Sequence, residues 1–469
     1  DEPYENMPAA EVGLKKGDVI LAIGDSSMVG KDVSYVSNHL RGDAGTTFIL
    51  TIQRPTANKK MKFKITRRAI QLPAVPYYGV QDGGVGYLNL NSFTTGCAKD
   101  VRRAFLDMKK QGMTSLVFDL RNNGGGSLQE AVNIVNMFVP KGITLVKTVG
   151  KMERANKEYK TSVEPIDTLM PIVVLVNDET ASASEITSGS LQDLDRAVVL
   201  GTRTYGKGLV QVSMDLPYNA NLKLTTSKYY IPSGRCIQAI NYKHTNGGYT
   251  EHVPDSLTHV FHTANGREVR DGGGIKPDVE VRPDSLPNIA FYLASSGRDS
   301  TEVMWNWELQ YLKKHPTIGP AKTFIISDAD FEDFKQAVLK SGFKYDRESK
   351  KYLENLVKLA KFEGYYDDAK PEFEALEKKL NHNLAKDLDY NKQTLKKVLT
   401  SDLVSAYYYQ KGSLENSLQF DKQWKKAVEI LKNPVEYKKL LQSVVSQPLV
   451  KLEPAINVSV DNKSKTKAK

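Results

Sequence analysis

The order of apolar and polar positions divides the chain into three parts. In residues 1–68 the segments Thr47–Gln53 and Met61–Thr66 alternate apolar and polar side chains, which is typical of half-buried strands. In residues 69–285 apolar strands alternate with helical segments, an order that favours a parallel or mixed sheet. Beyond residue 285 the apolar residues recur at helical spacing. The pattern therefore predicts a multidomain α/β protein with a β-rich N-terminal module and a helical C-terminal domain.

Two places in the middle part show a strand that runs through a turn into a helix. The strand Ser115–Leu120 leads into the turn RNNGGG, residues 121–126, and then into a helix that begins at Ser127. The strand Pro171–Val176 leads into a helix start rich in serine and alanine, TASASE, residues 180–185. Free backbone N–H groups at such helix starts attract negative charge. We therefore expect the chemistry of this protein in these two turns.

The remaining segments of the middle part are predicted to complete the site. The strand Ala197–Leu200 precedes a second glycine turn, TYGKGLVQ, residues 204–211, and Leu222–Tyr230 reads as a further strand. Residues 141–170 are polar and rich in lysine, and we interpret them as a small cap over the site.

Residues 286–455 are predicted to form a helical domain rich in lysine and glutamate. Three segments carry one apolar stripe each at helical spacing, namely Phe331, Phe334 and Val338; Leu353, Leu356 and Ala360; and Phe373, Leu376 and Leu380. We expect each stripe to be buried. The alternative is a partner-binding surface through which the helices form a homo-oligomer or hold an adaptor. Residues 456–469 read as a disordered basic tail.

The amino-acid composition limits the classes of protein to which the chain can belong. The chain has 469 residues, of which 40% are apolar and 26% charged, as expected of a protein with two or three domains and sizeable cores. The net charge of +10 comes largely from lysines scattered over helices, without the clustered arginines and aromatic residues of a nucleic-acid site. No apolar run approaches the ~20 residues that span a bilayer. No signal peptide is recognisable, and the start at Asp1 without methionine is typical of a processed form or a fragment.

Three further chemistries are disfavoured by spacing. The two cysteines, Cys97 and Cys236, make neither a disulfide framework nor a zinc site. The histidines of one segment, which we interpret as a long surface loop, match no zinc pattern; they are His244, His252, His259 and His262. The segment Gly201–Gly208 mimics a phosphate-binding loop, but Gly208 stands where magnesium needs a serine or threonine hydroxyl.

A serine nucleophile in the TASASE segment with a lysine base in the TYGKGLVQ turn fits the sequence better than these three chemistries. A serine hydroxyl attacks a carbonyl group only when a base removes its proton, and no histidine lies in either turn. A lysine can replace histidine when burial favours the neutral amine, and the glycines beside Lys207 let backbone pack closely around it. Gln211 follows four residues later and could orient the amine. The candidate nucleophiles are Ser182, Ser184, Ser188 and Ser190, of which the earliest lies nearest the turn.

The oxyanion formed by such an attack needs two N–H donors at about 3 Å. The Gly124–Gly126 loop can supply one donor, and the residue that follows the nucleophile at the helix start can supply the other.

The motifs LRNNGGG, NDETASASE and TYGKGLVQ together resemble those of the carboxyl-terminal processing (tail-specific) peptidases. The resemblance covers most of residues 1–285. It implies a crotonase-like spiral α/β core, no metal and no cofactor. It also implies a place in the bacterial periplasm or cell envelope, and protein or peptide substrates with apolar C-termini.

The resemblance also assigns the site residues. In that family the nucleophile precedes the lysine by twenty-five positions, which selects Ser182 for Lys207 (207 − 182 = 25). The third member of the site falls on Gln211, and the oxyanion donors fall on Gly125 and Ala183. The reaction implied is that of a serine endopeptidase that forms an acyl-enzyme and cleaves proteins near their C-terminus.

Asp193 matches a position that is sometimes assigned to catalysis in this family. It follows Ser182 by eleven residues (193 − 182 = 11), which on a regular helix is roughly 16 Å along the axis. Because that distance is too long for contact with the hydroxyl, we expect Asp193 to be structural.

The N-terminal motif PAAEVGLKKGDVILAI, residues 8–23, resembles the latter part of a PDZ domain. PDZ domains hold a peptide C-terminus by adding the peptide to their sheet. In modules of this kind the carboxylate loop lies upstream of the PAAEVGL helix, where this sequence has only six or so residues. We therefore expect a partial PDZ module over 1–68 with an incomplete groove, either docking substrate or serving as a plain structural module. An inactive peptide-binding scaffold of the same fold is the alternative function, although the chain keeps both Ser182 and Lys207.

Overall fold

The computed structural model of the protein describes residues 2–239, 253–295, 299–380 and 383–442. The tail predicted over 456–469 and two of the histidines noted above, His244 and His252, lie outside the described residues. The chain forms two compact units, one of Asp1–Leu72 with Asp284–Asp421 and the other of Pro73–Pro283 with Lys422–Lys469. The predicted multidomain α/β architecture is confirmed.

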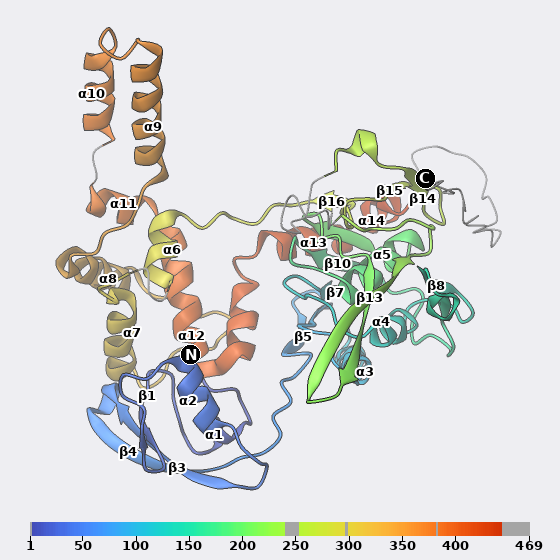
Figure 1. Ribbon diagram of the computed structural model, residues 1–469, viewed down its shortest axis with the longest axis horizontal. Helices are drawn as coiled ribbons and strands as arrows, with labels where there is room; N and C mark the ends of the chain where they lie inside the picture. Colours follow the sequence, from blue (N-terminus) through green and yellow to red (C-terminus); the bar gives the residue numbers. More distant parts are fainter. Residues whose placement is uncertain (1, 240–252, 296–298, 381–382, 443–469) are drawn as a thin grey trace, which may run out of the picture. The chain divides into compact units, whose positions relative to one another are not determined.

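The first unit begins with the β-rich module, a four-stranded antiparallel sheet in the order β2-β1-β3-β4 (Figure 1). Alternate residues of the strands, among them Leu50, Ile52 and Ile65, point inward and form its small core. The Asp32 carboxylate accepts a hydrogen bond from Tyr35 N and so caps the second helix. The elements are α1 (Pro8–Glu11), β1 (Val19–Ile23), β2 (Ser26–Ser27), α2 (Val33–Leu40), β3 (Thr47–Arg54) and β4 (Lys59–Thr66).

Helices within residues 288–341 and 384–417 of the first unit share a second core, which includes Trp307, Phe331 and Phe334. Lys16 of the β-rich module joins this part of the unit, because its amine lies 2.6 Å from Asp402 Oδ1 and 3.7 Å from Glu308 Oε2. The helices that follow the β-rich module in this unit are α6 (Asn288–Ala294), α7 (Val303–Lys314), α8 (Asp328–Ser341), α9 (Glu348–Glu363), α10 (Lys370–Lys379), α11 (Leu384–Tyr390) and α12 (Lys392–Ser417).

The three predicted apolar stripes differ in how far they are buried. The stripe of α8 is buried as predicted, since Phe331, Phe334 and Val338 are all less than 2% exposed. The prediction holds only in part for α9 and α10, where Ala360 is 8% exposed but Leu356 is 50% and Leu376 42% exposed. These two helices form a hairpin (Figure 1), so much of each helix surface faces away from its partner. Helical spacing predicts an apolar face but not the element that covers it.

The second unit is built on a six-stranded sheet in the order β16-β11-β10-β7-β6-β5. All neighbouring strands are parallel except the β5–β6 pair, as the predicted βα alternation requires. The strands are β5 (Tyr77–Gln81), β6 (Val85–Asn89), β7 (Ser115–Asp119), β10 (Ile172–Val176), β11 (Val198–Gly201) and β16 (Val279–Glu280).

Helices bury both faces of this sheet. Leu116 and Phe118 of β7 enter the main core with α3 (Cys97–Lys110), α4 (Leu128–Val135) and α5 (Ala183–Asp193). Val117 points to the other face and is also fully buried, because α13 (Lys422–Lys432) packs on β7, β10 and β11. The helical region predicted over 286–455 is thus divided, with α13 and α14 (Pro434–Leu440) belonging to the second unit.

A second sheet of this unit, in the order β12-β13-β8-β9, includes strands from the segment predicted as a cap, but no residue of that segment is among those that line the Ser182 pocket. Residues 141–170 supply β8 (Thr144–Gly150) and β9 (Lys157–Lys160), which pair with the hairpin β12 (Leu209–Leu216) and β13 (Ala220–Tyr230). The predicted surface loop is wrong in its described part, because Val260 and Phe261 pair with β15 (Glu268–Arg270) as the short strand β14 (Val260–His262).

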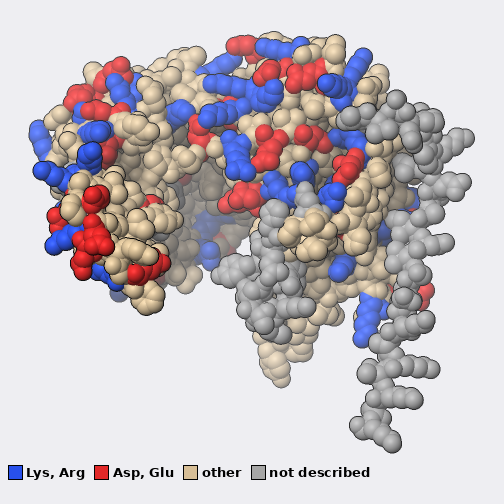
Figure 2. Space-filling view, turned by 90° about the horizontal axis from the view of Figure 1, so that it is seen from above, with Lys and Arg blue, Asp and Glu red and all other residues tan. Residues whose placement is uncertain are grey.

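Charged side chains of both signs are intermingled on the face shown in Figure 2. Among the described helices, none is both long and apolar enough to cross a membrane. The described residues also contain no group of three or more His, Cys, Asp or Glu side chains arranged to hold a metal ion.

Candidate active site

Ser182 occupies a sharp turn between β10 and α5. Its backbone angles, φ 58° and ψ −115°, lie in a region that side-chain-bearing residues rarely adopt. Such a conformation costs about 1–3 kcal/mol and persists only where the surrounding structure enforces it. The turn places Ser182 before the first residue of α5 with its side chain partly accessible. Strain of this kind at a serine between a strand and a helix is typical of a nucleophile.

The other candidate serines are satisfied in the interior. Ser184, Ser188 and Ser190 are all 0% exposed. The hydroxyl of Ser184 donates to Asn123 O at 2.8 Å, and that of Ser188 donates to Ser184 O at 2.9 Å. Ser182 is therefore the accessible hydroxyl among the four candidates.

The five predicted catalytic and oxyanion residues line one pocket of about 500 Å³. They are Ser182, Lys207, Gln211, Gly125 and Ala183, and they come from three separate stretches of the chain. Among the described residues no carboxylate pairs with the Lys207 amine, and the Glu185 carboxylate instead accepts a hydrogen bond from Lys207 N. The side chain of Gln211 is exposed and donates to Thr225 Oγ1 at 3.5 Å; the described contacts include no hydrogen bond from it to Lys207.

Glu185 holds the backbone of Ser182 and of Lys207 at the same time. Its Oε2 accepts hydrogen bonds from Ser182 N at 2.9 Å and from Lys207 N at 2.8 Å. Its Oε1 accepts from Thr204 Oγ1 at 2.6 Å and Gly206 N at 2.7 Å. Burial raises the pKa of this fully buried carboxyl group, and the four donors act in the opposite direction. One carboxylate thus fixes the relation between the two turns.

Tyr229 forms a second connection between the same two residues. Its hydroxyl lies 2.8 Å from Lys207 O and 3.3 Å from Ser182 O, and its backbone N donates to Gly208 O at 3.0 Å. The ring is only 1% exposed, and burial raises the pKa of the phenol well above its usual value. The hydroxyl therefore remains a hydrogen-bond donor at neutral pH.

The two predicted oxyanion donors differ in whether their N–H groups already donate a hydrogen bond within the structure. Ala183 is the first residue of α5, so its N–H has no acceptor within the helix and lies at the positive end of the helix dipole. Gly125 lies against the nucleophile, since a Cβ built on it would be 2.8 Å from Ser182 Cβ. The N–H of Gly125, however, donates to Asn123 Oδ1 at 2.9 Å. The Gly125 peptide must turn away from Asn123 before it can bind an oxyanion.

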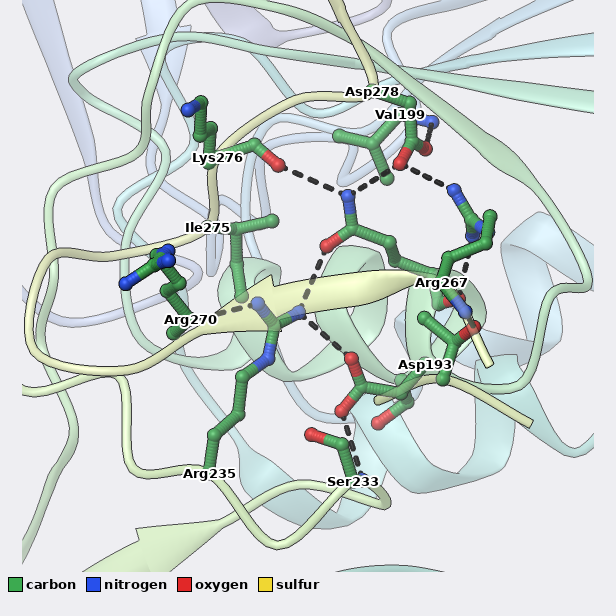
Figure 3. A network of polar contacts seen from close by, with 12 residues as sticks. Asp193, Val199, Ser233, Arg235, Arg267, Arg270, Ile275, Lys276 and Asp278 are labelled. Carbon is green, nitrogen blue, oxygen red and sulfur yellow. Dashed lines mark hydrogen bonds and ion pairs between the residues drawn. The ribbon is translucent and has the colours of Figure 1, made fainter. Parts of the chain in front are cut away.

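Asp193 is held in a buried polar network at the far end of α5 (Figure 3). Its Oδ1 lies 2.7 Å from Arg235 Nη2, and its Oδ2 accepts from Ser233 N at 3.0 Å. The side chains of Asp193 and Arg235 are 0% and 1% exposed. Asp193 is not among the residues that line the Ser182 pocket. Its contacts are those of an anchor between α5 and the segment after β13.

Sequence reasoning missed Glu185 and Tyr229, although one signal was present. Glu185 follows Ser182 by three residues, the spacing of a capping box, in which an acidic side chain reaches back to the backbone N–H before the helix. That spacing could have drawn attention to Glu185. Tyr229 is separated from Lys207 by twenty-two residues, and only the fold reveals their contact.

We expect Glu185→Gln to lower kcat by roughly 10- to 100-fold with little change in KM. The amide NH₂ would face backbone N–H donors in place of a carboxylate oxygen, so Ser182 and Lys207 would no longer be held in register. Steady-state kinetics on a peptide substrate measures the effect.

The matched control is Glu130→Gln. Glu130 also accepts from two backbone N–H groups, those of Gly96 and Ala98, but at the start of α3. Equal losses of kcat in both variants would contradict a specific role for Glu185.

The pocket thus contains an accessible serine and a lysine, and three segments of the chain match known families. Residues 84–245 match peptidase family S41, residues 1–54 a PDZ domain, and residues 292–431 the C-terminal helical domain of probable PDZ-proteases. Residues 84–245 thus match peptidase family S41, and the resemblance to carboxyl-terminal processing peptidases seen in the sequence is confirmed.

Curated proteins and one solved structure are similar to parts of this chain. A carboxy-terminal-processing protease of Bartonella bacilliformis is 38% identical over 51% of this chain and 55% of the relative. A probable CtpA-like serine protease of Staphylococcus aureus is 31% identical over 76% of this chain and 60% of the relative. The chain thus spans a little over half the length of these relatives. The solved photosystem II D1 C-terminal processing protease is 27% identical over 60% of this chain and 67% of its own, with a TM-score of 0.34.

Proposed function

We propose that the protein is a serine endopeptidase that cleaves other proteins near their C-terminus through an acyl-enzyme. The observation that carries the proposal is the strained, accessible Ser182, whose backbone is tied by Glu185 and Tyr229 to that of Lys207. The match to peptidase family S41 supports the reaction class.

In the proposed first step the Ser182 oxygen attacks the scissile carbonyl carbon, and the neutral Lys207 amine takes the hydroxyl proton. The carbonyl oxygen becomes an oxyanion that the Ala183 N–H stabilises, together with the Gly125 N–H once that peptide has turned. Collapse of the intermediate breaks the C–N bond, and Lys207 returns the proton to the leaving amine. Gln211 orients the Lys207 amine during these proton transfers.

In the proposed second step water hydrolyses the acyl-enzyme. Lys207 accepts a proton from water, the hydroxide oxygen adds to the ester carbon, and Ser182 leaves with the proton returned to it. The product is a shortened protein with a new carboxylate, and the enzyme regains its starting state.

The pocket lining supports substrates with apolar residues next to the cleaved bond. Leu128, Ile186, Leu209 and Val210 face the same space as Ser182. An apolar side chain buried there would gain about 1.5–3 kcal/mol over an exposed one. We therefore propose unstructured proteins with apolar C-termini as the substrate class, bound with the help of the PDZ module.

The family resemblance also supports a place outside the bacterial cytoplasm, in the periplasm or cell envelope. Release of the native protein by osmotic shock or with the envelope fraction would support this location, and recovery with cytoplasmic markers would refute it.

The deciding experiment incubates the protein with an unstructured protein that ends in apolar residues, and maps the new termini by mass spectrometry. A fluorophosphonate, which reacts with activated serines, is added to a parallel sample. We expect cleavage near the C-terminus and a single labelled peptide that contains Ser182. Binding of the substrate without cleavage or labelling would instead favour the inactive scaffold.

A further inference from the structure

The segment Arg235–Ala239, here called the strap, runs directly behind the turn that carries Lys207. The side-chain oxygen of Gln238 accepts a hydrogen bond from Gly208 N at 2.6 Å, and Ala239 N donates to Gly206 O at 2.9 Å. The packing leaves no room for side chains in the turn. A Cβ on Gly206 would lie 2.4 Å from Ala239 Cβ, and one on Gly208 would lie 2.8 Å from Gln238 N. The glycines beside Lys207 therefore fit the strap.

The other end of the strap is anchored on α5, the helix that begins after Ser182. Arg235 donates to Asp193 Oδ1 at 2.7 Å and to Gln192 Oε1 at 2.8 Å, and both residues belong to the last turn of α5 (Figure 3). The middle of the strap is held as well, because Gly274 N donates to Ile237 O at 3.0 Å. The strap thus connects the C-terminal end of α5 to the lysine turn.

The backbone of the lysine turn is fully engaged by these neighbours. Glu185 accepts from the N–H groups of Gly206 and Lys207, and Tyr229 binds the carbonyl groups of Lys207 and Gly208. The N–H of Gly208 is taken by Gln238. Loss of the Gln238 oxygen would leave this buried donor without an acceptor, which the turn can relieve only by moving.

We propose that Gln238 is a positioning residue for Lys207, and that the Asp193–Arg235 pair sets the strap in register with the helix that carries Ser182. The proposal rests on the proposed Ser182–Lys207 mechanism and extends it to residues that do not touch the substrate. It predicts that an aspartate remote from the pocket influences the lysine turn through the strap. The titratable groups that face the turn are Glu185 of α5 and Tyr229 and Lys223 of β13.

The test compares Gln238→Met with Gln238→Glu. Methionine keeps the length of the side chain but removes the acceptor, so we expect kcat to fall by roughly 10- to 100-fold while KM changes little. Glutamate keeps an acceptor for Gly208 N, so we expect it to restore kcat to within about 3-fold of wild type. The side chain in Gln238→Asn is too short for its oxygen to reach the turn, so this variant should behave like Gln238→Met.

A control separates positioning from stability. Asn136→Leu removes another side-chain oxygen that accepts from backbone N–H groups, those of Ser162 and Val163, elsewhere in the same unit. We expect it to lower the melting temperature without changing kcat. Equal kcat in wild type, Gln238→Met and Gln238→Asn would overturn the proposal, as would a loss of kcat in Gln238→Glu as large as in Gln238→Met.

A second readout does not need turnover. Competitive acetylation with acetic anhydride at one fixed pH reports how fast each lysine amine reacts. In Gln238→Met we expect the acetylation rate of Lys207 to change, because its turn has moved, while the rate of the exposed Lys110 stays constant. An unchanged Lys207 rate would count against positioning. If the wild-type protein cleaves nothing, the proposed function fails, and this measurement still decides the role of Gln238.

Discussion

Ser182→Ala and Lys207→Met are each expected to lower the rate of cleavage by roughly 10³-fold or more, because the two side chains act as one unit. Alanine removes the attacking oxygen, and methionine removes the amine that accepts its proton while keeping a similar side-chain length. For the same reason the double variant should lose little more than either single variant. Progress curves on an unstructured protein with an apolar C-terminus measure the rates.

The control for Lys207→Met is Lys110→Met, which removes an exposed lysine from α3 and is expected to leave the rate unchanged. Equal cleavage by wild type and by both active-site variants would exclude the mechanism.

The sequence predicted the elements of the site because its signals are local. A strand followed by TASASE, and a second strand followed by a glycine-flanked lysine, place each residue on its element without knowledge of the whole fold. The choice of Ser182 among four serines needed the family spacing. In the structure the other three serines are fully buried, whereas the side chain of Ser182 is partly accessible.

What the sequence did not reveal depends on contacts between distant segments. Tyr229 and Gln238 reach the lysine turn only because β13 and the strap fold back onto it. The hydrogen bond from Gly125 N to Asn123 Oδ1 likewise depends on a local conformation that the glycine-rich motif permits but does not dictate. The partly exposed stripes of α9 and α10 show the same limit, because helical periodicity identifies an apolar face but not the element that packs against it.

The second large effect is expected at the Asp193–Arg235 ion pair. Arg235→Met leaves the Asp193 carboxylate buried without its cation, and Asp193→Leu leaves the guanidinium without its anion. Breaking one side of a buried pair costs about 3–5 kcal/mol. In a folding unit of this size such a loss lowers the melting temperature by roughly 6–20 °C. Differential scanning calorimetry of the full chain measures the shift.

The double variant Asp193→Leu/Arg235→Met decides whether the loss comes from an unpaired charge. Because two apolar side chains leave no buried charge behind, we expect it to be more stable than either single variant. Arg103→Met, which breaks an exposed ion pair with Asp100, should shift the melting temperature very little. If the double variant instead loses the sum of the two single effects, Asp193 and Arg235 do not stabilise the fold as a pair. The link from α5 to the lysine turn would then have to run through other contacts of the strap.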